Sequence, residues 1–307
     1  MKFSIGYSVR SSDGLVPEII RHKDRISEVY FSFGKTPSGR NDQTRCEGLS
    51  PHEAEAKQIC DLIALRDAGL KFNLLFNANC YGAESQSKCF FKELGDMVDY
   101  LNDLISLSSV TTTSPLIAKF IKQNFKGIDV RASVNMSVGS PRAMEYILDY
   151  FDSYYVKREL NRNFAALREI RKFCDEHGKE MYLLANSGCL NDCSTHTFHD
   201  NLVAHEAEIS KRDNGYQFTG VCREYLSKNK NGDTILSALN FIRPEDTYRY
   251  EGLTPAMKLA TRVHERPERV IRAYAERQGF SGNVLSLLEP NHANLLYPYV
   301  LENSKIG

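Results

Sequence analysis

Three cysteines near one predicted strand are the residues of this chain best suited to chemistry. Cys189 and Cys193 directly follow the apolar run 181–185, and Cys222 lies further along the chain. The run is typical of a buried strand, and thiols on a tight turn at its end can converge on one metal ion or cluster. The C-x3-C spacing is a weak motif alone, but a third cysteine strengthens it. We predict that these three thiols bind one metal centre.

The positions of the other five cysteines separate candidate metal ligands from residues expected to pack in the core. Four thiolate ligands suit an iron–sulfur cluster or structural zinc. Zinc normally uses two close C-x2-C pairs, which this chain lacks, so scattered ligands favour the cluster and leave zinc as the alternative. We expect Cys80 as fourth ligand, with Cys46 in reserve, because both follow predicted strands. Cys60, Cys89 and Cys174 lie on predicted helices, where we expect them to pack as small apolar residues.

Histidines gather just after the C-x3-C turn. His196 and His199 follow Cys193 closely, and His205 comes next. A cysteine paired with a histidine can act as a nucleophile, whereas a histidine beside a metal site can instead support its ligands through hydrogen bonds. H-E-x-x-H and G-x-S-x-G are absent. The catalytic residues therefore stay unassigned.

The elements that must position these residues alternate regularly. Predicted strands, several of them near-continuous apolar runs, cover 2–7, 27–33, 71–77, 107–112, 129–135, 153–157, 181–186 and 237–243. Such runs are typical of parallel strands buried on both faces. Eight strands alternating with helices favour a TIM-type (β/α)8 barrel. The rival is a doubly wound sheet, but its G-x-G-x-x-G loop is absent.

Four Ser/Thr-Pro pairs mark predicted helix starts, with a hydroxyl N-cap before proline at the first helical position. They are Ser50-Pro51, Ser114-Pro115, Ser140-Pro141 and Thr254-Pro255. No repeat or linker divides the chain, so we expect one domain over 1–307. Within it, 194–234 is predicted to be an insertion between strands seven and eight. Residues 262–307 are predicted to form a C-terminal helical cap.

Polar residues collect at the predicted carboxyl ends of the strands, where barrel enzymes place their sites. A guanidinium can hold a carboxylate through two parallel hydrogen bonds, so arginines there predict an anionic ligand. Glu159, Glu245 and Asp246 offer the alternative of internal ion pairs. The predicted substrate-binding residues are Arg131, Arg158, Arg243, Asn77, Asn135, Asn186, His196 and His199.

Composition narrows the class of partner. Lys+Arg and Asp+Glu both number 39 in 307 residues, so the formal net charge is zero. Bulk electrostatic capture of nucleic acid or an anionic membrane is therefore not expected. We find no signal-peptide-like start and no apolar run long enough for a membrane span. Eight cysteines in such a chain are expected to be reduced thiols in the cytoplasm.

Several motifs together resemble the collagenase-like peptidases of family U32. They are NSGC at 186–189 with Cys193, then Cys222-Arg223, IRPED at 242–246 and KLATR at 258–262. The resemblance implies a barrel and a peptidase name whose catalytic residues are unassigned. Better understood relatives imply a 4Fe–4S cluster on four cysteines. They also imply oxygen-independent hydroxylation of ubiquinone precursors or RNA, with prephenate as oxygen donor.

Carried over by residue, Cys189, Cys193 and Cys222 match the cysteine-rich part of the family, while the fourth ligand varies in position. The chain lacks the additional C-terminal domains of the RNA-modifying members and has no basic excess, which argues against nucleic acid. We therefore expect an iron–sulfur enzyme that modifies a small carboxylate-bearing molecule, such as prephenate. The alternatives are a cysteine- or metal-dependent peptidase, and a non-catalytic partner subunit with a structural cluster.

Overall fold

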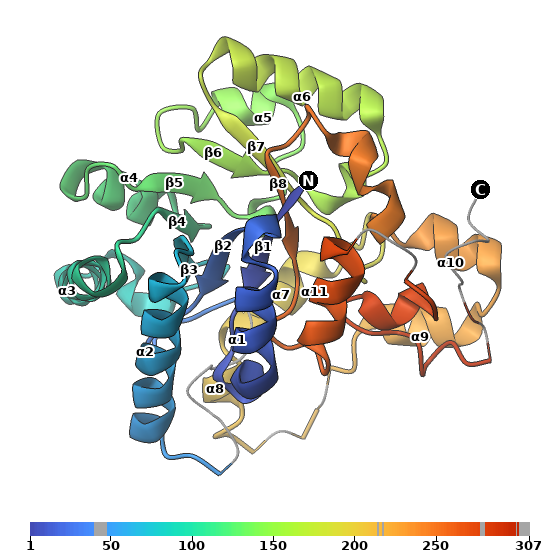
Figure 1. The fold of residues 1–307 in the computed structure, drawn as a ribbon, viewed down its shortest axis with the longest axis horizontal. Helices are drawn as coiled ribbons and strands as arrows, with labels where there is room; N and C mark the ends of the chain where they lie inside the picture. Colours follow the sequence, from blue (N-terminus) through green and yellow to red (C-terminus); the bar gives the residue numbers. More distant parts are fainter. Residues whose placement is uncertain (40–47, 214, 217, 277–279, 299, 301–307) are drawn as a thin grey trace.

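The protein is a closed barrel of eight parallel strands, as predicted (Figure 1). The computed structural model describes residues 1–39, 48–213, 215–216, 218–276, 280–298 and 300. Each strand pairs with the next, and β8 pairs with β1 to close the sheet. The strands are β1 (Lys2–Gly6), β2 (Ile26–Phe31), β3 (Phe72–Phe76), β4 (Ser109–Thr112), β5 (Asp129–Ala132), β6 (Ser153–Tyr155), β7 (Glu180–Leu184) and β8 (Ala256–Leu259).

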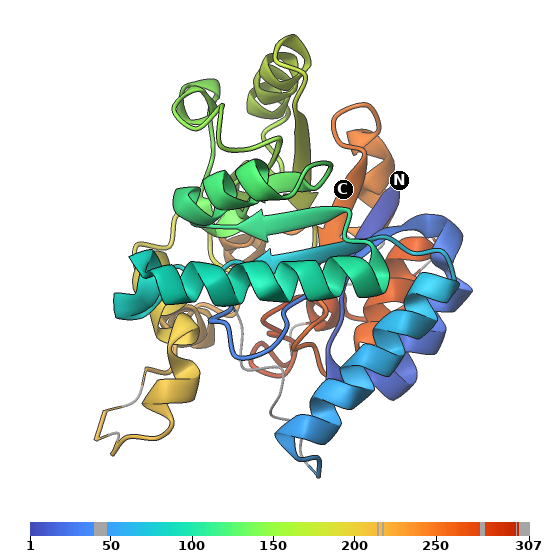
Figure 2. The same cartoon turned by 90° about the vertical axis from the view of Figure 1, so that its left-hand side faces the viewer.

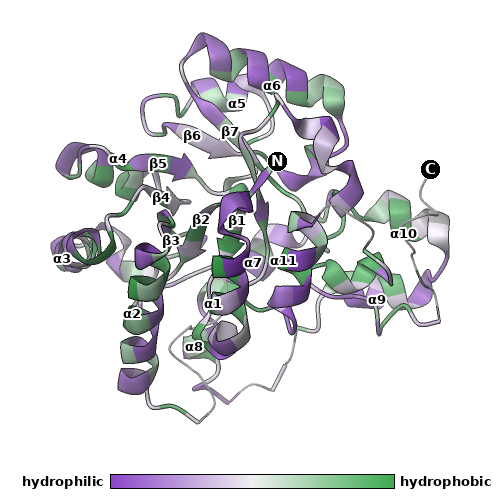
Figure 3. Ribbon diagram, in the orientation of Figure 1, coloured by the Kyte–Doolittle hydropathy of each residue, from purple (hydrophilic) through white to green (hydrophobic). Residues whose placement is uncertain are grey.

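Helices follow the strands and form the outer ring. The helices of the ring are α1 (Ser12–Arg21), α2 (Pro51–Asp67), α3 (Lys88–Ile105), α4 (Pro115–Asn124), α5 (Pro141–Glu145), α6 (Phe164–Glu176) and α11 (Pro267–Ala275). Three of the predicted N-caps are confirmed, because Ser50, Ser114 and Ser140 each accept a hydrogen bond from the first turn. The helices turn polar faces outward (Figure 3). Among the described residues, no helix is long and apolar enough to cross a membrane.

The predicted eighth strand is wrong. Residues 237–243 end α10 (Gly232–Ala238) and continue as a loop, and β8 lies later in the chain. The apolar side chains that suggested a strand have other partners: Leu239 and Phe241 pack with Leu226 and Leu285 in a second, smaller core. Thr254-Pro255 does not start a helix, since the Thr254 hydroxyl hydrogen-bonds to the backbone carbonyls of Met181 in β7 and Ala256 in β8.

The insertion between β7 and β8 is consequently longer than the predicted 194–234. It holds α7 (His196–Ala204), α8 (Glu206–Ile209), α9 (Val221–Lys228), α10 and the 3-10 helix η6 (Pro244–Tyr250). Figure 2 shows α7 and α8 projecting from one end of the barrel. Within the predicted cap, α11 instead packs beside α1 in the ring, and a segment containing η7 (Val284–Leu287) runs back to the end of β7.

The interior of the barrel is polar, whereas its outside is apolar. Alternate residues of each strand, such as Phe3 and Ile5, face the helices and build the main core. The intervening positions carry polar side chains that hydrogen-bond to one another inside the barrel, including Ser4, Glu28, Asn73, Ser109, Thr111 and Arg131. This inner layer lies beneath the site described next.

Candidate functional site

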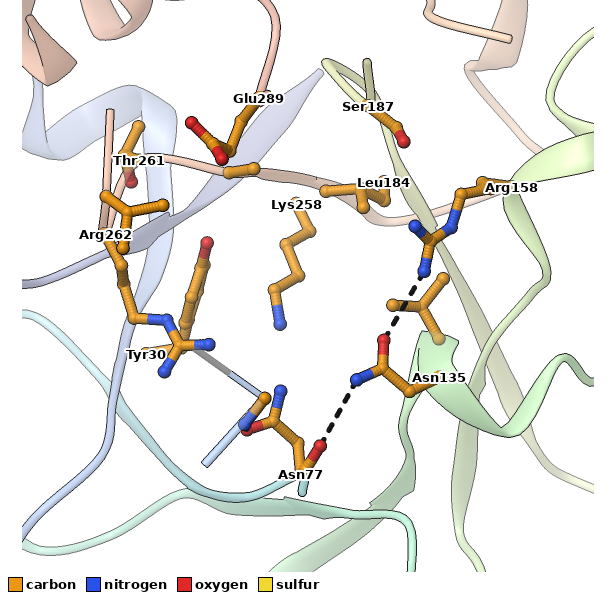
Figure 4. Close-up of a pocket in the computed structure, with 14 residues that line it drawn as sticks. Tyr30, Asn77, Asn135, Arg158, Leu184, Ser187, Lys258, Thr261, Arg262 and Glu289 are labelled. Carbon is orange, nitrogen blue, oxygen red and sulfur yellow. Dashed lines mark hydrogen bonds between the residues drawn. The ribbon is translucent and has the colours of Figure 1, made fainter. Parts of the chain in front are cut away.

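A small pocket opens at the carboxyl ends of the strands, and we call it the mouth pocket (Figure 4). Its polar lining residues come from β2, from β8 and the loop after it, from the segments after β3, β5, β6 and β7, and from the C-terminal segment. Its volume is about 50 Å³, room for little more than one or two water molecules. It therefore fits one small group of a ligand, such as a carboxylate. The polar residues that line it are Tyr30, Asn77, Asn135, Arg158, Ser187, Lys258, Thr261, Arg262 and Glu289.

Three buried cations dominate this pocket. Arg158, Lys258 and Arg262 are 4%, 6% and 7% exposed. The Lys258 ammonium lies 3.9 Å from the centre of the Tyr30 ring and 4.9 Å from that of Tyr155. Arg262 donates to the Ser38 hydroxyl at 2.9 Å. Clustered cations in a buried pocket create a positive potential, which suits an anionic group.

Of the three arginines predicted at the rim, Arg158 lines the mouth pocket and the other two lie elsewhere. Arg131 does not line the mouth pocket, because it lies inside the barrel 2.7 Å from the Glu28 carboxylate and 2.6 Å from Asp129. Arg243 donates to Asp246 at 2.6 Å, the internal pairing that was the alternative. Strand alternation alone places an arginine inside a barrel, but its depth decides whether a ligand can reach it.

The three predicted cysteines line a second cavity, which we call the thiol cavity. Cys189, Cys193 and Cys222 all face this space of about 300 Å³. Cys189 and Cys193 come from the loop after β7, and Cys222 lies in the first turn of α9. Burial raises the pKa of the Cys222 thiol, and the nearby Cys189 and Cys193 raise it further. All three predicted thiols therefore line one cavity.

Arg158 connects the two cavities. Its Nη1 lies 3.0 Å from Sγ of Cys189, and its Nη2 donates to Asn135 at 3.4 Å. One arginine thus contacts both a potential ligand thiol and the pocket for an anion.

The thiols of the thiol cavity are the type of donor that an iron–sulfur cluster uses. In the described part of the chain, no three His, Cys, Asp or Glu side chains stand close enough to hold one ion. A cluster distributes its thiolate ligands over several iron atoms, so it needs thiols around a shared space rather than around one point. Cys189, Cys193 and Cys222 have that arrangement.

The fourth ligand stays a prediction. Cys80 is half-buried and does not line the thiol cavity as its side chain lies, and Cys46 falls outside the described residues. Of the cysteines expected in the core, Cys174 is buried, but Cys60 and Cys89 are exposed. The expectation was wrong for these two because each lies on an outward face of its helix.

The histidines belong to the thiol cavity rather than to the mouth pocket. His196 and His199 both line it. His196 Nε2 lies 3.3 Å from an oxygen of Asp200, which also receives a 3.4 Å hydrogen bond from Asn79. The cavity therefore combines thiols with a histidine–carboxylate pair.

The predicted asparagines have different roles. Asn77 and Asn135 line the mouth pocket and bond to each other, since Asn135 Nδ2 donates to the Asn77 carbonyl at 3.2 Å (Figure 4). Asn186 was wrongly expected to bind substrate. It is 0% exposed, and its side chain bonds to the backbone of Ala260 and Leu287. It thereby joins the end of β7 to β8 and to the returning C-terminal segment.

The turn at Gly188 requires glycine. A Cβ atom there would collide with the backbone carbonyl oxygen of Pro290. We expect Gly188→Ala to lower the free energy of unfolding, measured by urea denaturation, by about 1–3 kcal/mol, because the backbone must shift. Gly14→Ala is the control: a Cβ on Gly14 meets nothing within 4 Å. Equal stability of the two variants would contradict this prediction.

Six polar residues of the mouth pocket were not among the predicted substrate-binding residues: Tyr30, Ser187, Lys258, Thr261, Arg262 and Glu289. Lys258 and Arg262 were noticed only as part of a family motif, because β8 was misplaced. Tyr30 lies within the apolar run of β2, and Glu289 comes from the predicted cap. Period-two alternation of polar residues, as in Glu28 and Tyr30 or Ser109 and Thr111, was the available signal for an inward-facing row.

Comparison with known proteins supports the family resemblance. The chain is 26% identical over 225 residues to the uncharacterized protease MJ1657 of Methanocaldococcus jannaschii; the match covers 72% of this chain and 64% of that protein, less than two thirds of its length. The solved structure of the U32 peptidase Mk0906 superposes with a TM-score of 0.59 at 15% identity, covering 84% of this chain and 91% of that one. No family model matches the chain. The resemblance predicted from the motifs is confirmed.

Proposed function

We propose that this barrel, a relative of the U32 peptidases, is an iron–sulfur enzyme that modifies a small carboxylate-bearing molecule. One observation carries the proposal: Arg158 lines the cationic mouth pocket and also lies 3.0 Å from Sγ of Cys189. An anion bound in the pocket and the Cys189 thiol would therefore both contact the Arg158 side chain. A cluster bound there would supply one-electron chemistry.

The residues of the chain have defined tasks in this proposal. Cys189, Cys193 and Cys222 would hold the cluster together with a fourth ligand. Lys258, Arg262 and Arg158 would bind and orient the carboxylate. Because the mouth pocket of about 50 Å³ admits one carboxylate, the rest of the ligand must extend towards the thiol cavity.

The finer chemistry rests on the family resemblance. An oxygen-independent hydroxylation needs an oxygen donor other than O2, and prephenate is the donor that the resemblance implies. As a carboxylic acid it suits the charge of the mouth pocket. Free thiols without a disulfide among the described cysteines agree with a reducing compartment, and we propose the cytoplasm.

Metal analysis of anaerobically purified protein tests the cluster. We expect iron and acid-labile sulfide in the wild type and their loss in Cys189→Ser, Cys193→Ser and Cys222→Ser. Cys60→Ser is the matched control, since Cys60 is exposed on α2 and should leave iron content unchanged. Stoichiometric zinc without iron would support the zinc alternative. Metal-free wild-type protein, reconstituted without success, would refute both.

A thiol peptidase is the second candidate, and one observation favours it. His196 beside Asp200 lines the same cavity as Cys189, which is the set of residue types that a cysteine nucleophile requires. The names of both matched proteins, a protease and a peptidase, agree with it. Hydrolysis of gelatin by metal-free protein, abolished by His196→Ala, would support this candidate over the cluster enzyme. A non-catalytic subunit would instead hold iron without binding acids.

A further inference from the structure

The C-terminal segment brings one acidic side chain to the boundary of the two cavities. Glu289 lines both the mouth pocket and the thiol cavity. Among the described residues that line the mouth pocket, it is the acidic one, and it shares the pocket with three cations. Figure 4 shows Glu289 and Thr261 at one edge of the pocket and Asn77 at the other, with Lys258 reaching between them. A ligand in the pocket would therefore lie close to both the cationic side chains and the Glu289 carboxylate.

The fold holds Glu289 in this place. Its backbone N–H donates to the Asn186 carbonyl at 2.9 Å, and its carbonyl accepts from Gly188 N–H at 2.8 Å. Residues 187 and 289 form a parallel bridge, so the segment adds to the end of β7 as a short strand would. The His292 ring contacts the Gly188 carbonyl at 2.8 Å and secures the same turn. These contacts fix the backbone that carries the carboxylate.

A carboxylate beside an anion pocket lowers the affinity of that pocket for an anion. Two negative charges a few ångströms apart repel each other, most strongly in a site that excludes water. A plain carboxylate ligand would therefore bind less tightly because of Glu289. For a ligand with a hydrogen-bond donor next to its carboxylate, Glu289 should strengthen binding instead. A hydrogen bond from that donor to a charged acceptor is among the stronger ones in proteins.

We propose that Glu289 selects ligands that carry an ammonium or hydroxyl group on the carbon next to the carboxylate. The cations of the mouth pocket take the carboxylate, and Glu289 accepts a hydrogen bond from the neighbouring substituent. The small volume of the pocket suits this short head group. The inference rests on the anion pocket of the proposed function, but not on the cluster.

Calorimetry with three acids of matched size tests the selection: propionate, L-lactate and L-alanine differ only in that substituent. We expect wild-type protein to bind lactate or alanine at least about tenfold more tightly than propionate. In Glu289→Gln, propionate should bind more tightly and alanine about tenfold more weakly. Lactate should change little, because the amide oxygen still accepts a hydrogen bond. The tighter ligand of the wild type identifies the class as amino or hydroxy acid.

Controls separate this inference from the proposal on which it rests. Glu84→Gln removes an exposed carboxylate remote from the pocket lining and should leave all three affinities unchanged. Glu289→Asp keeps the charge and should keep the wild-type order, even if Glu289→Gln folds poorly by circular dichroism. Equal affinities of the wild type for the three acids, or a shift of all three in one direction in Glu289→Gln, would overturn the selection alone. Binding of none of them would overturn the anion pocket as well.

Discussion

Replacing Arg131 with methionine is expected to lower the free energy of unfolding by about 3–5 kcal/mol, because it leaves a buried carboxylate without its ion-pair partner. Glu28 is 3% exposed, and Arg131 lies 2.7 Å from it inside the barrel. Urea denaturation at neutral pH measures the loss. Arg142→Met is the matched control, because Arg142 pairs with Glu145 on the surface and should cost less than about 1 kcal/mol.

The same pair predicts a dependence on pH. Burial alone would raise the pKa of Glu28, but the Arg131 guanidinium and hydrogen bonds from Asn73 and Ser4 hold it below its ordinary value. A depressed pKa in the folded state means that this stabilisation is present above the unfolded-state pKa and is lost as the pH falls through the folded-state value. Wild-type stability should therefore fall more steeply in acid than that of Arg131→Met. Parallel acid profiles would contradict the assignment.

Replacing Lys258 with methionine is expected to weaken acid binding by about tenfold to a hundredfold, because it removes one charged hydrogen-bond donor from the mouth pocket. Methionine keeps most of the side-chain length that packs against Tyr30 and Tyr155. The unfolding free energy should thus change far less than in Arg131→Met. Calorimetry with L-lactate and L-alanine measures the affinity, and urea denaturation measures the stability.

The two variants together distinguish a binding residue from a structural one. Arg131→Met should lose stability but keep its affinity for acids, since Arg131 lies outside the mouth pocket. Lys258→Met should lose affinity and keep stability. If Arg131→Met alone lost acid binding, the anion would have to enter the polar interior of the barrel. Unchanged affinity in Lys258→Met would remove Lys258 from the site.

Much of the scaffold follows from local features of the sequence. Seven strands were predicted within a few residues, because parallel strands buried on both faces produce short apolar runs that few other elements produce. Ser50, Ser114 and Ser140 marked three helix starts correctly, since capping depends only on neighbouring backbone groups. The same logic failed at Thr254-Pro255, where the threonine bonds to Met181 and Ala256 across the barrel end.

The eighth strand shows the limit of prediction from local sequence patterns. β8 (Ala256–Leu259) is short and contains Lys258, whereas the run around Leu239 and Phe241 is more apolar and looks more like a strand. That run is buried by α9, α10 and the C-terminal segment, which come together only in the tertiary structure. No local rule assigns an apolar residue to one core rather than another.

The sequence alone predicted the barrel from its alternating strands and helices, and the place of Arg158 from its position after β6. It also grouped Cys189, Cys193 and Cys222, from their order in the chain and the family motifs. Only the tertiary structure decided that Arg131 is a buried ion-pair partner, that Lys258 and Arg262 supply the pocket's charge, and that Glu289 reaches it. The reason is geometric. Alternation tells which side of a strand a residue faces, but the register around the closed sheet sets its depth, and long-range packing brings a distant segment to the mouth.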